Sequence, residues 1–416
     1  PIPNPARGGP RSDEAVSLSQ ELRLEVAVQQ AFARNPEIRA AVARLGEARG
    51  RLTDAETYPY NPTAQGQAAS RRGGGQSSVD FEVGVGQQIE IAGQRGDRID
   101  TARAELAAER ARLLRAQRLL AARVHLAFVA ALEARELLEV SRSDVELARR
   151  LYDLAQRRLD RGAGTRLDVN VAAAELGRAE ARYQAAQAVY QAQRATLAEA
   201  MGLETFLPLP QGELHVSLDA LPSLEQLVES ARAHRADLQV LRDLEAASLA
   251  RHELARSEAW PDLTLEAFAG HEEASDTIIG GRLSVPIPLF NRNQGRVEET
   301  RAQIARVQAE RHAGELSVWQ EVVAAHARYE TSLRTIERLR ELVFGTLEQN
   351  MELLKRSFEA GKATWPEVVV IRRLLVDAQR ELTTAEASAR RAWVELKVAA
   401  GQMPVPEFNG NRKDEQ

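Results

Sequence analysis

The chain repeats itself at an offset of 199 to 200 residues. A period of this length is a duplicated half and not a short solenoid repeat. The fold is therefore expected to consist of two similar halves with pseudo-twofold symmetry. The matched pieces are 27–38 with 227–238, 158–169 with 357–368, and Met201 and Gly202 with Ala400 and Gly401.

The composition favours long helices over ordinary globular domains. Aromatic residues make up only 5% of the 416 residues and charged residues 28%, while Ala, Arg, Glu, Gln and Leu dominate long stretches. A formal net charge of −5 is small for this length, so neither a nucleic acid nor an anionic membrane surface is indicated as a partner. The absence of cysteine excludes disulfides, thiolate metal sites and a cysteine nucleophile.

The sequence has no run of about 18 apolar residues, which excludes a transmembrane helix but not transmembrane strands, whose signal is alternation. The chain starts at Pro1, so we expect a signal peptide to have been removed, and a lipid-bearing N-terminal cysteine is not in this numbering.

Each half contains a predicted β-hairpin. From Val79 to Ile91, apolar residues alternate with polar residues and glycine, which is typical of a strand with one apolar face. The segment after Trp260 alternates in the same way, and a fourth strand is predicted over 277–287. The first strand, 63–71, has the weakest pattern.

A very long helix is predicted after each hairpin, about 94–160 and about 292–360, and neither contains proline. At 1.5 Å per residue each would be roughly 100 Å long. A helix is also predicted from Leu22 to about Thr57, ending at the prolines that follow. In each half, one helix precedes the hairpin and another follows the long helix. Each of these is a little over half the length of the long helix, so two of them stacked end to end match one long helix. The long helix carries an apolar stripe that suits such pairing, formed by Ile99, Ala102, Leu106, Leu113, Leu120, Val124, Phe128, Ala131 and Leu138.

A self-contained soluble bundle or coiled coil would explain the helices alone. The hairpins argue against it, because their apolar faces have no helix left to cover them. Four strands are too few to close a barrel, which needs about eight, but several protomers that pool their strands would close one. The sequence thus predicts a mainly helical protein with a small transmembrane β part.

These features resemble the TolC-like outer-membrane efflux proteins over residues 20 to 402. In that family the turn between the long helix and the next one typically reads Phe-Glu-x-Gly-x-x-Thr-x-x-Asp-Val. Here residues 159–169 read Leu-Asp-Arg-Gly-Ala-Gly-Thr-Arg-Leu-Asp-Val, and residues 358–368 read Phe-Glu-Ala-Gly-Lys-Ala-Thr-Trp-Pro-Glu-Val. Matches at both symmetric positions make the resemblance specific.

The resemblance implies a homotrimer whose chains contribute four strands each to a 12-strand β-barrel continuous with an α-helical tunnel. It implies a periplasmic adaptor (membrane fusion protein) and an inner-membrane transporter of the RND type as partners, with outer-membrane lipid around the barrel. The adaptor would dock on the two tip turns. The implied docking residues are Gly162, Gly164, Thr165, Gly361 and Thr364.

The residues of these turns also have a purely local explanation. Gly162 and Gly361 are expected to adopt the positive φ that ends a helix, and Thr165 and Thr364 to cap the next one. The acids three residues later, Asp168 and Glu367, would each complete a capping box, which can be all they do.

The resemblance gives the same acids a second role, because the turns narrow the tunnel. Three copies of Glu367 would form a ring that attracts cations. The best-known members of the family carry a second acidic ring three positions later, where this chain has Val370, so a double acidic gate is in doubt. The residues expected to line or gate the constriction are Asp168, Arg166, Glu367 and Trp365.

The strand-to-helix transitions 89–95 and 286–295 look like those of the heavy-metal-cation branch of the family. Simple geometry explains them as well, because prolines break the strand ladder and Gly93 and Gly295 allow a bend. The boundaries expected from all these patterns are an extended arm 1–20, a first repeat 21–202, a linker 203–222, a second repeat 223–402 and a tail 403–416. Within the repeats we expect hairpins at about 63–92 and 262–288, long helices at about 94–160 and 292–360, and tip turns at 161–165 and 361–364.

Other candidate chemistry is sparse, and no catalytic, cofactor-binding or metal site is predicted. The triplet His271, Glu272 and Glu273 has metal-ligand residue types but reads as a solvated hairpin loop. Trp260 is expected either to anchor at a membrane interface or to pack at the joint between barrel and helices. The isolated histidines, expected on surfaces or tunnel walls, are His125, His252, His312 and His326.

The resemblance therefore implies the passive outer-membrane exit duct of a tripartite efflux system in a Gram-negative bacterium, with a periplasmic helical extension. The substrates would include heavy-metal cations if the branch assignment holds. The alternative is a soluble helical coiled-coil scaffold or adaptor protein. An enzyme is the third option, and no constellation of residues supports it.

Overall fold

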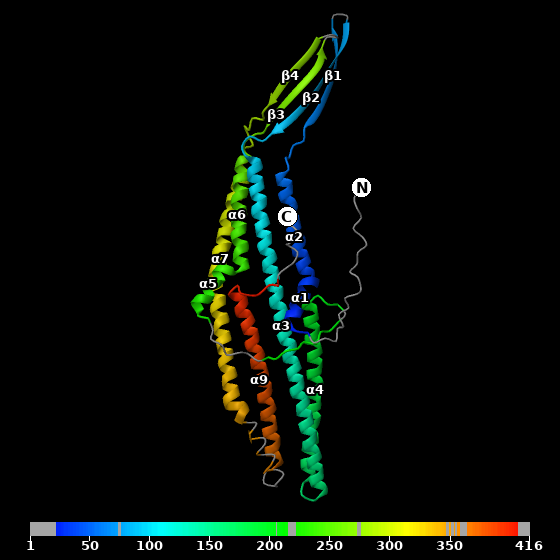
Figure 1. Ribbon diagram of the computed structural model, residues 1–416, viewed down its shortest axis with the longest axis vertical. Coiled ribbons are helices and arrows are strands. Elements are labelled where there is room, and N and C mark those ends of the chain that lie inside the picture. The colour runs from blue at the N-terminus through cyan, green and yellow to red at the C-terminus, as the bar shows by residue number, and fades with distance from the viewer. Residues whose placement is uncertain are drawn as a thin grey trace. The chain divides into compact units, whose positions relative to one another are not determined.

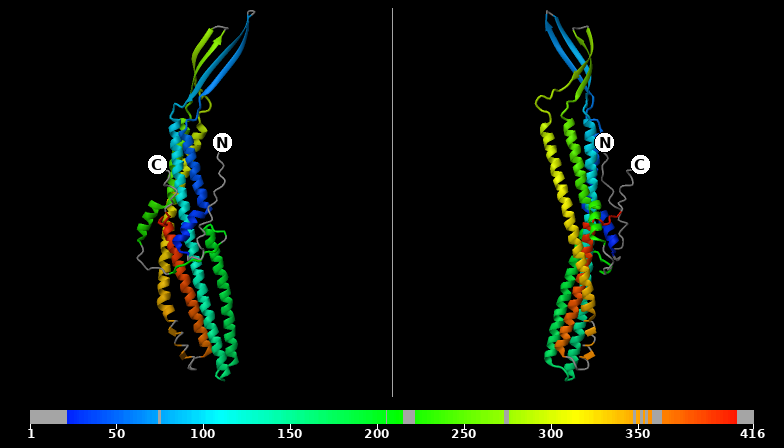
Figure 2. Two further views of the ribbon diagram at one scale, coloured as in Figure 1. Left: turned by 45° about the vertical axis from the view of Figure 1, so that its right-hand side comes forward. Right: turned by 90° about the vertical axis from the view of Figure 1, so that its left-hand side faces the viewer.

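A computed structural model of the chain describes residues 22–73, 76–204, 206–214, 222–272, 276–346, 349–350, 353, 356–357 and 364–406. The predicted arm 1–20, residues 205 and 215–221 of the linker and most of the tail therefore lie outside the described residues. The two halves have the same order of elements, as the duplication predicts: two helices, a β-hairpin, a long helix and a final helix (Figure 1, Figure 2).

The first half contains α1 (Leu24–Arg34), α2 (Pro36–Glu56), β1 (Thr63–Gly73), β2 (Gln76–Ile89), α3 (Gln94–Asp160) and α4 (Arg166–Ala200). The second half contains α5 (Leu224–His234), α6 (Ala236–Ser257), β3 (Leu263–Glu272), β4 (Asp276–Ser284), α7 (Gln294–Arg338), the π-helical segment η1 (Leu339–Phe344) and α9 (Trp365–Ala399). The 67 residues of α3 confirm the predicted long helix.

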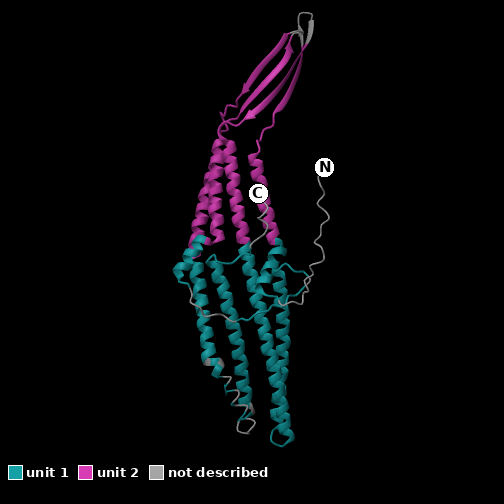
Figure 3. Cartoon of the chain, in the orientation of Figure 1, with its two compact units in different colours: residues 1–36, 117–233, 319–416 teal, residues 37–116, 234–318 magenta. Residues whose placement is uncertain are grey.

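The chain forms two compact units, each built from both halves (Figure 3). Unit 1 comprises residues 1–36, 117–233 and 319–416, and unit 2 comprises residues 37–116 and 234–318. The long helices α3 and α7 contribute residues to both units.

Unit 2 contains one four-stranded antiparallel sheet in the order β1-β2-β3-β4, so the two hairpins join through β2 and β3. Because antiparallel partners share a face, the register separates the side chains into two sets. Glu82, Glu266 and Arg282 lie on the polar face. The apolar face carries Val79, Phe81, Val83, Val85, Leu265, Ile279 and Leu283, all of them exposed in the single chain.

The helices of unit 2 pack through small apolar contacts and ion pairs. Leu45 and Ala48 of α2 form a buried cluster with Leu106 of α3. Arg251 of α6 donates to Glu105 of α3 at 2.6 Å. Both helices that precede a hairpin, α2 and α6, therefore contact the first part of the long helix α3.

The helices of unit 1 bury the central part of the predicted apolar stripe of α3, and Leu120, Val124 and Ala131 are among its least exposed side chains. The helices α4 and α9 end alike, at Gly202 with a φ of 71° and at Gly401 with a φ of 70°. These glycines take the left-handed conformation that closes a helix, so the symmetry of the two copies extends to their last residues.

The prediction of one continuous helix over 22–57 is wrong, because the segment is divided into α1 and α2 at Asn35. Asn35 is extended, with a φ of −65° and a ψ of 126°, since a proline at 36 disfavours helical geometry in the residue before it. The second copy breaks at Arg235 with nearly the same angles but without a proline. There Arg235 pairs with Asp237 at 2.5 Å, and the Asp237 carboxylate accepts the backbone N–H of Leu238.

The second long helix also differs from the prediction of uninterrupted α-helix. α7 passes into the π-helical turn η1, where Arg340 forms an ion pair with Glu386 of α9. Such turns widen the helix locally and are uncommon. None of the side chains of η1 that the structure describes explains its formation.

The two long helices begin in the same way after their hairpins. Gly93 and Asn293 both have a positive φ, 83° and 58°, and Asn293 is the one non-glycine residue with this geometry among the described residues. In each copy the next side chain, that of Gln94 or Gln294, accepts a backbone N–H two residues earlier, at 2.9 and 2.7 Å. This shared turn changes the chain direction from strand to helix.

A pair of glycine substitutions at this turn is expected to act in opposite directions. Gly93→Ala should lower the free energy of unfolding by roughly 1–2 kcal/mol, because an L-residue is strained at this φ. Gly96→Ala, inside α3, should raise it by about 0.5–1 kcal/mol. An added Cβ meets no atom within 4 Å at either position, so the backbone alone sets the sign. Thermal unfolding followed by circular dichroism would measure both, and shifts of equal sign would contradict this interpretation.

Candidate functional site

The first tip turn, residues 161–165, joins α3 to α4 at one end of unit 1 (Figure 1). Gly162 has a φ of 70°, as predicted, and its N–H donates to the Leu159 carbonyl at 2.9 Å. The Ala163 N–H donates to the Arg158 carbonyl at 2.8 Å. These two bonds close the end of α3 and hold the turn in a tight, exposed loop.

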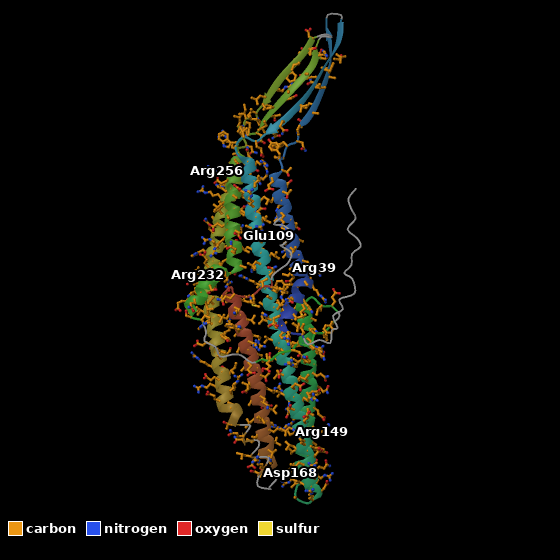
Figure 4. All side chains as sticks on the ribbon, viewed as in Figure 1. Arg39, Glu109, Arg149, Asp168, Arg232 and Arg256 are labelled. Atoms are coloured by element: carbon orange, nitrogen blue, oxygen red, sulfur yellow. The ribbon has the colours of Figure 1, made fainter. Side chains whose placement is uncertain are left out.

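Thr165 caps α4 and forms the predicted capping box with Asp168. The Asp168 N–H donates to the Thr165 hydroxyl at 3.2 Å, and the Asp168 carboxylate accepts the Thr165 N–H at 2.9 Å. Asp168 is labelled at this end of α4 in Figure 4. Arg166 is exposed on the first turn of α4, and the neighbouring Leu167 is exposed over 70% of its surface.

The second tip turn is described only from Thr364 onward, so Gly361 lies outside the described residues, as does the side chain of Trp365. The Glu367 carboxylate accepts the Thr364 N–H at 2.7 Å and the Thr364 hydroxyl at 2.8 Å. These two donors hold the pKa of Glu367 below its usual range. Glu367 therefore completes the predicted capping box with Thr364. Its carboxylate remains negatively charged at neutral pH.

The first turns of α4 and α9 pack together beside the tip turns. Ala172 of α4 and Val368 and Val369 of α9 form a buried cluster with Ala155 of α3. The two acids each bond to their own helix cap, and no bond between them is described. Val370, in the position of the missing second acidic ring, is exposed.

Two turns of helix farther along, a buried ion network ties α9 to α3 and α4. Arg372 is only 1% exposed and donates to Asp144 of α3 at 2.6 Å and to Glu175 of α4 at 2.7 Å. Glu175 also accepts from Arg373, whose hydrogen bond is the main cause that lowers the pKa of Glu175. Arg182, partly exposed, pairs with Asp144 at 2.9 Å.

This network was not predicted from the sequence. Its one local signal is a pair of arginines within the apolar run Val-Val-Val-Ile-Arg-Arg-Leu-Leu-Val of α9. The acidic partners of Arg372 are 228 and 197 residues away along the chain.

On the polar face of the sheet, Arg282 of β4 bridges two strands. It pairs with Glu266 of β3 at 2.9 Å and with Glu82 of β2 at 3.2 Å, and its guanidinium lies 5.1 Å from the centre of the Phe268 ring. An added Cβ at Gly280 would lie 2.5 Å from that ring, so this glycine makes room for Phe268.

The candidate metal ligands do not form a site in the described residues. His271 lies in β3, where its ring meets Phe81 and its Nδ1 lies 3.3 Å from the Thr277 hydroxyl, while Glu273 lies outside the described residues. His252 contacts the Thr300 hydroxyl at 2.9 Å. No group of three His, Asp or Glu side chains in the described part of the chain is arranged to hold a metal ion. Within the same residues, no helix is both long enough and apolar enough to cross a membrane.

Two long helices, a sheet with one apolar face and two capped tip turns define the fold of outer-membrane efflux channels. The solved structure of the outer-membrane channel OprN matches this chain with a TM-score of 0.76 at 20% identity, over 92% of this chain and 91% of that one. A solved structure of CusC matches with a TM-score of 0.75 at 18% identity, over 92% and 95% of the two chains. At these identities the matches establish the fold.

The sequence comparisons establish the family. The sequence profile of the family described as outer membrane efflux protein matches residues 27–203 and again residues 227–402, once in each half. The cobalt-zinc-cadmium resistance protein CzcC of Cupriavidus metallidurans is 27% identical over 369 residues, covering 86% of this chain and 85% of that protein. The chain belongs to the outer membrane efflux protein family. The family consists of outer-membrane channels of Gram-negative bacteria and is not a class of enzymes, and this chain is accordingly an outer-membrane protein.

Proposed function

We propose that this protein is the passive exit duct of a tripartite efflux system. The observation that carries the proposal is the four-stranded sheet, in which β1 and β4 are the edges and one face is apolar. Edges exposed to lipid need partners, so β4 of one chain pairs with β1 of the next and three chains close a 12-strand barrel. The helices of the trimer then form the periplasmic tunnel.

In this arrangement the tip turns are the docking surface for a periplasmic adaptor. Gly162 bends the first turn so that its backbone and the exposed Leu167 are accessible to a partner. In the sequence repeat, Gly361 and Thr364 are the counterparts of these turn residues in the other half. An adaptor bound to both turns would connect the duct to an inner-membrane transporter of the RND type.

The tunnel constriction is proposed to lie at the same end. Glu367 remains charged, and three copies would form a ring that attracts cations. Asp168, Arg166 and Trp365 occupy the neighbouring positions. One helical turn farther along α9, the exposed Val370 stands where a second acidic ring would be. The constriction would then have an acidic ring of Glu367 followed by an apolar ring of Val370.

The proposed substrates are heavy-metal cations. The support is the relative named as a cobalt-zinc-cadmium resistance protein, together with the strand-to-helix transitions 89–95 and 286–295, which resemble those of the heavy-metal-cation branch. Among the described residues no group of side chains is arranged to hold a metal ion, so in this proposal the cations pass through that part of the duct without a resident site. Cells that lack it should accumulate Co²⁺, Zn²⁺ and Cd²⁺ when challenged, as measured by elemental analysis. Unchanged accumulation of all three would contradict the substrate assignment.

The tip turns provide a sharper test of the duct. Gly162→Val with Gly361→Val is expected to abolish export while leaving the trimer intact, because a β-branched residue does not adopt the φ of 70° found at Gly162. Metal accumulation, adaptor cross-linking and the heat-sensitive trimer band on gels would be measured together.

The matched control for this experiment is Gly177→Ala in α4, where an added Cβ meets no atom within 4 Å. It should leave export and cross-linking unchanged. Normal export by the double variant would contradict the proposed docking role of the tip turns. Purification of the protein without detergent as a monomer would favour the soluble scaffold instead.

A further inference from the structure

The polar face of the sheet in unit 2 carries an aromatic side chain that two glycines accommodate. Phe268 of β3 is paired with Gly84 on β2 and with Gly280 on β4. An added Cβ would lie 3.2 Å from the Phe268 Cβ at position 84 and 2.5 Å from the ring at position 280. The two glycines therefore leave open the space in which the ring lies.

Arg282 lies over this ring and joins two carboxylates. Its guanidinium is 5.1 Å from the centre of the Phe268 ring, and it donates to Glu266 at 2.9 Å and to Glu82 at 3.2 Å. The Glu266 side chain is only 7% exposed and that of Glu82 30%, whereas that of Arg282 is 49% exposed. The guanidinium is thus the most exposed of the three charged groups, and its one positive charge stands against two negative ones.

The duplication shows that the fold does not require a cation at position 282. Glu266 and Arg282 are directly opposite each other on β3 and β4. The corresponding pair on β1 and β2 is Gln67 and Glu82, which precede them by 199 and 200 residues. A glutamate therefore occupies in the first hairpin the place that Arg282 occupies in the second. The two copies of this position have opposite charges and pair with each other across the sheet.

The two carboxylates would suit a divalent cation if Arg282 were absent. Both lie within 3.2 Å of one guanidinium, so a single cation in its place would contact both. Carboxylate oxygens bind Zn²⁺ at about 2.0–2.2 Å. A pore, however, conducts only ions that it holds weakly enough to release. Two such carboxylates without a positive side chain between them would retain the ion that the pore conducts.

We propose that Arg282 determines the selectivity of the barrel interior by keeping Glu82 and Glu266 from holding divalent cations. The proposal rests on the proposed function, because it requires the polar face of the sheet to line a water-filled barrel. Each chain then contributes one net negative charge at this level, two carboxylates against one guanidinium. The three chains together attract cations without offering them an unoccupied pair of carboxylates, so Zn²⁺ passes and is not retained.

Zinc block of the Na⁺ current tests the proposal in the full trimer, reconstituted into planar lipid bilayers. Every channel carries Glu367→Gln, so that the constriction proposed at the tip adds no ring of carboxylates. Arg282→Gln is expected to lower the Zn²⁺ concentration that halves the current by about tenfold, because it removes a positive charge in direct contact with the two carboxylates. An unchanged half-blocking concentration in a conducting channel would overturn the proposal.

Two further variants at the same place separate charge from structure. Arg282→Lys keeps the positive charge, and its channel should need as much Zn²⁺ for half block as the channel with Arg282. Arg282→Gln combined with Glu82→Gln and Glu266→Gln should lose the added sensitivity, because no carboxylate is left to hold the ion. Sensitivity that persists in this triple variant would place the block elsewhere and contradict the proposal.

A permeability measurement covers the case in which Arg282→Gln does not insert. Glu82→Gln with Glu266→Gln leaves Arg282 in place and makes the ring positive, so the ratio of Na⁺ to Cl⁻ permeability should fall by about twofold or more. An unchanged ratio with an intact current would overturn the role of Arg282 and leave the duct standing. If the protein with Arg282 carries no ion current at all, the proposed function itself fails.

Discussion

Replacement of Asp144 by alanine is expected to lower the free energy of unfolding by about 3 kcal/mol, because it removes one of the two carboxylates that pair with the buried guanidinium of Arg372. Arg372 is 1% exposed and held between Asp144 and Glu175 at 2.6 and 2.7 Å. The side chain of Asp144 is itself only 2% exposed, so its carboxylate is shielded from bulk solvent. Arg182, the other partner of Asp144, is partly exposed and remains hydrated. Thermal or urea unfolding of the purified protein, followed by helical circular dichroism, would measure the loss.

The chain offers a matched control on the same two helices. Arg149 of α3 pairs with Glu180 of α4 at 3.1 Å, but both side chains are about half exposed or more. Arg149→Ala should therefore cost less than about 1 kcal/mol. Equal losses for Asp144→Ala and Arg149→Ala would show that the network of Arg372 is not a buried one in solution.

A third variant separates the unpaired charge from the loss of packing. Changing Asp144, Glu175 and Arg372 together to leucine, leucine and methionine removes all three buried charges while keeping the volume apolar. Such replacements of buried ion groups are often neutral or stabilising. The free energy of unfolding of this variant should be closer to that of the native protein than the free energy of unfolding of Asp144→Ala is. Arg178 and Arg373 lose their shared partner Glu175 but are exposed enough to be hydrated.

Most of the fold was predictable because its signals are local and occur twice. The glycine of the first tip turn, its threonine cap and its acid lie within seven residues, so short-range helix-capping rules suffice to predict their geometry. The alternation in β2 likewise fixes which side chains share a face before any partner strand is known. The structure confirms these features at Gly162, Thr165 and Asp168.

The features that sequence reasoning missed depend on distant or weak signals. Arg372 meets acids from two other helices, and no pattern in α9 specifies those partners. The break at Asn35 had a signal in the following proline, but the equivalent break at Arg235 has none and follows only from the duplication. The roles proposed for Glu367 and Val370 in a constriction depend on three chains together and stay predictions.

A substitution on the exposed apolar face of the sheet is also expected to have a large effect. Ile279→Lys is expected to prevent insertion of the trimer into the outer membrane. Ile279 lies on edge strand β4, is 83% exposed, and shares the apolar face with Ala269, its partner on β3. A lysine on the lipid face of a barrel costs about 2–4 kcal/mol at mid-membrane, and a trimer carries three of them. The heat-sensitive trimer band in outer-membrane fractions would be lost.

The control is Gln65→Lys, on the other edge strand but on the polar face, since Gln65 is paired with Gly84. In a barrel this side chain faces the water-filled interior, so the trimer should assemble normally. A soluble scaffold would tolerate both lysines equally, because both positions are then exposed to water. The contrast between two lysines on opposite faces thus separates a lipid-facing sheet from a solvated one. It does so without depending on the adaptor, the transporter or the substrate.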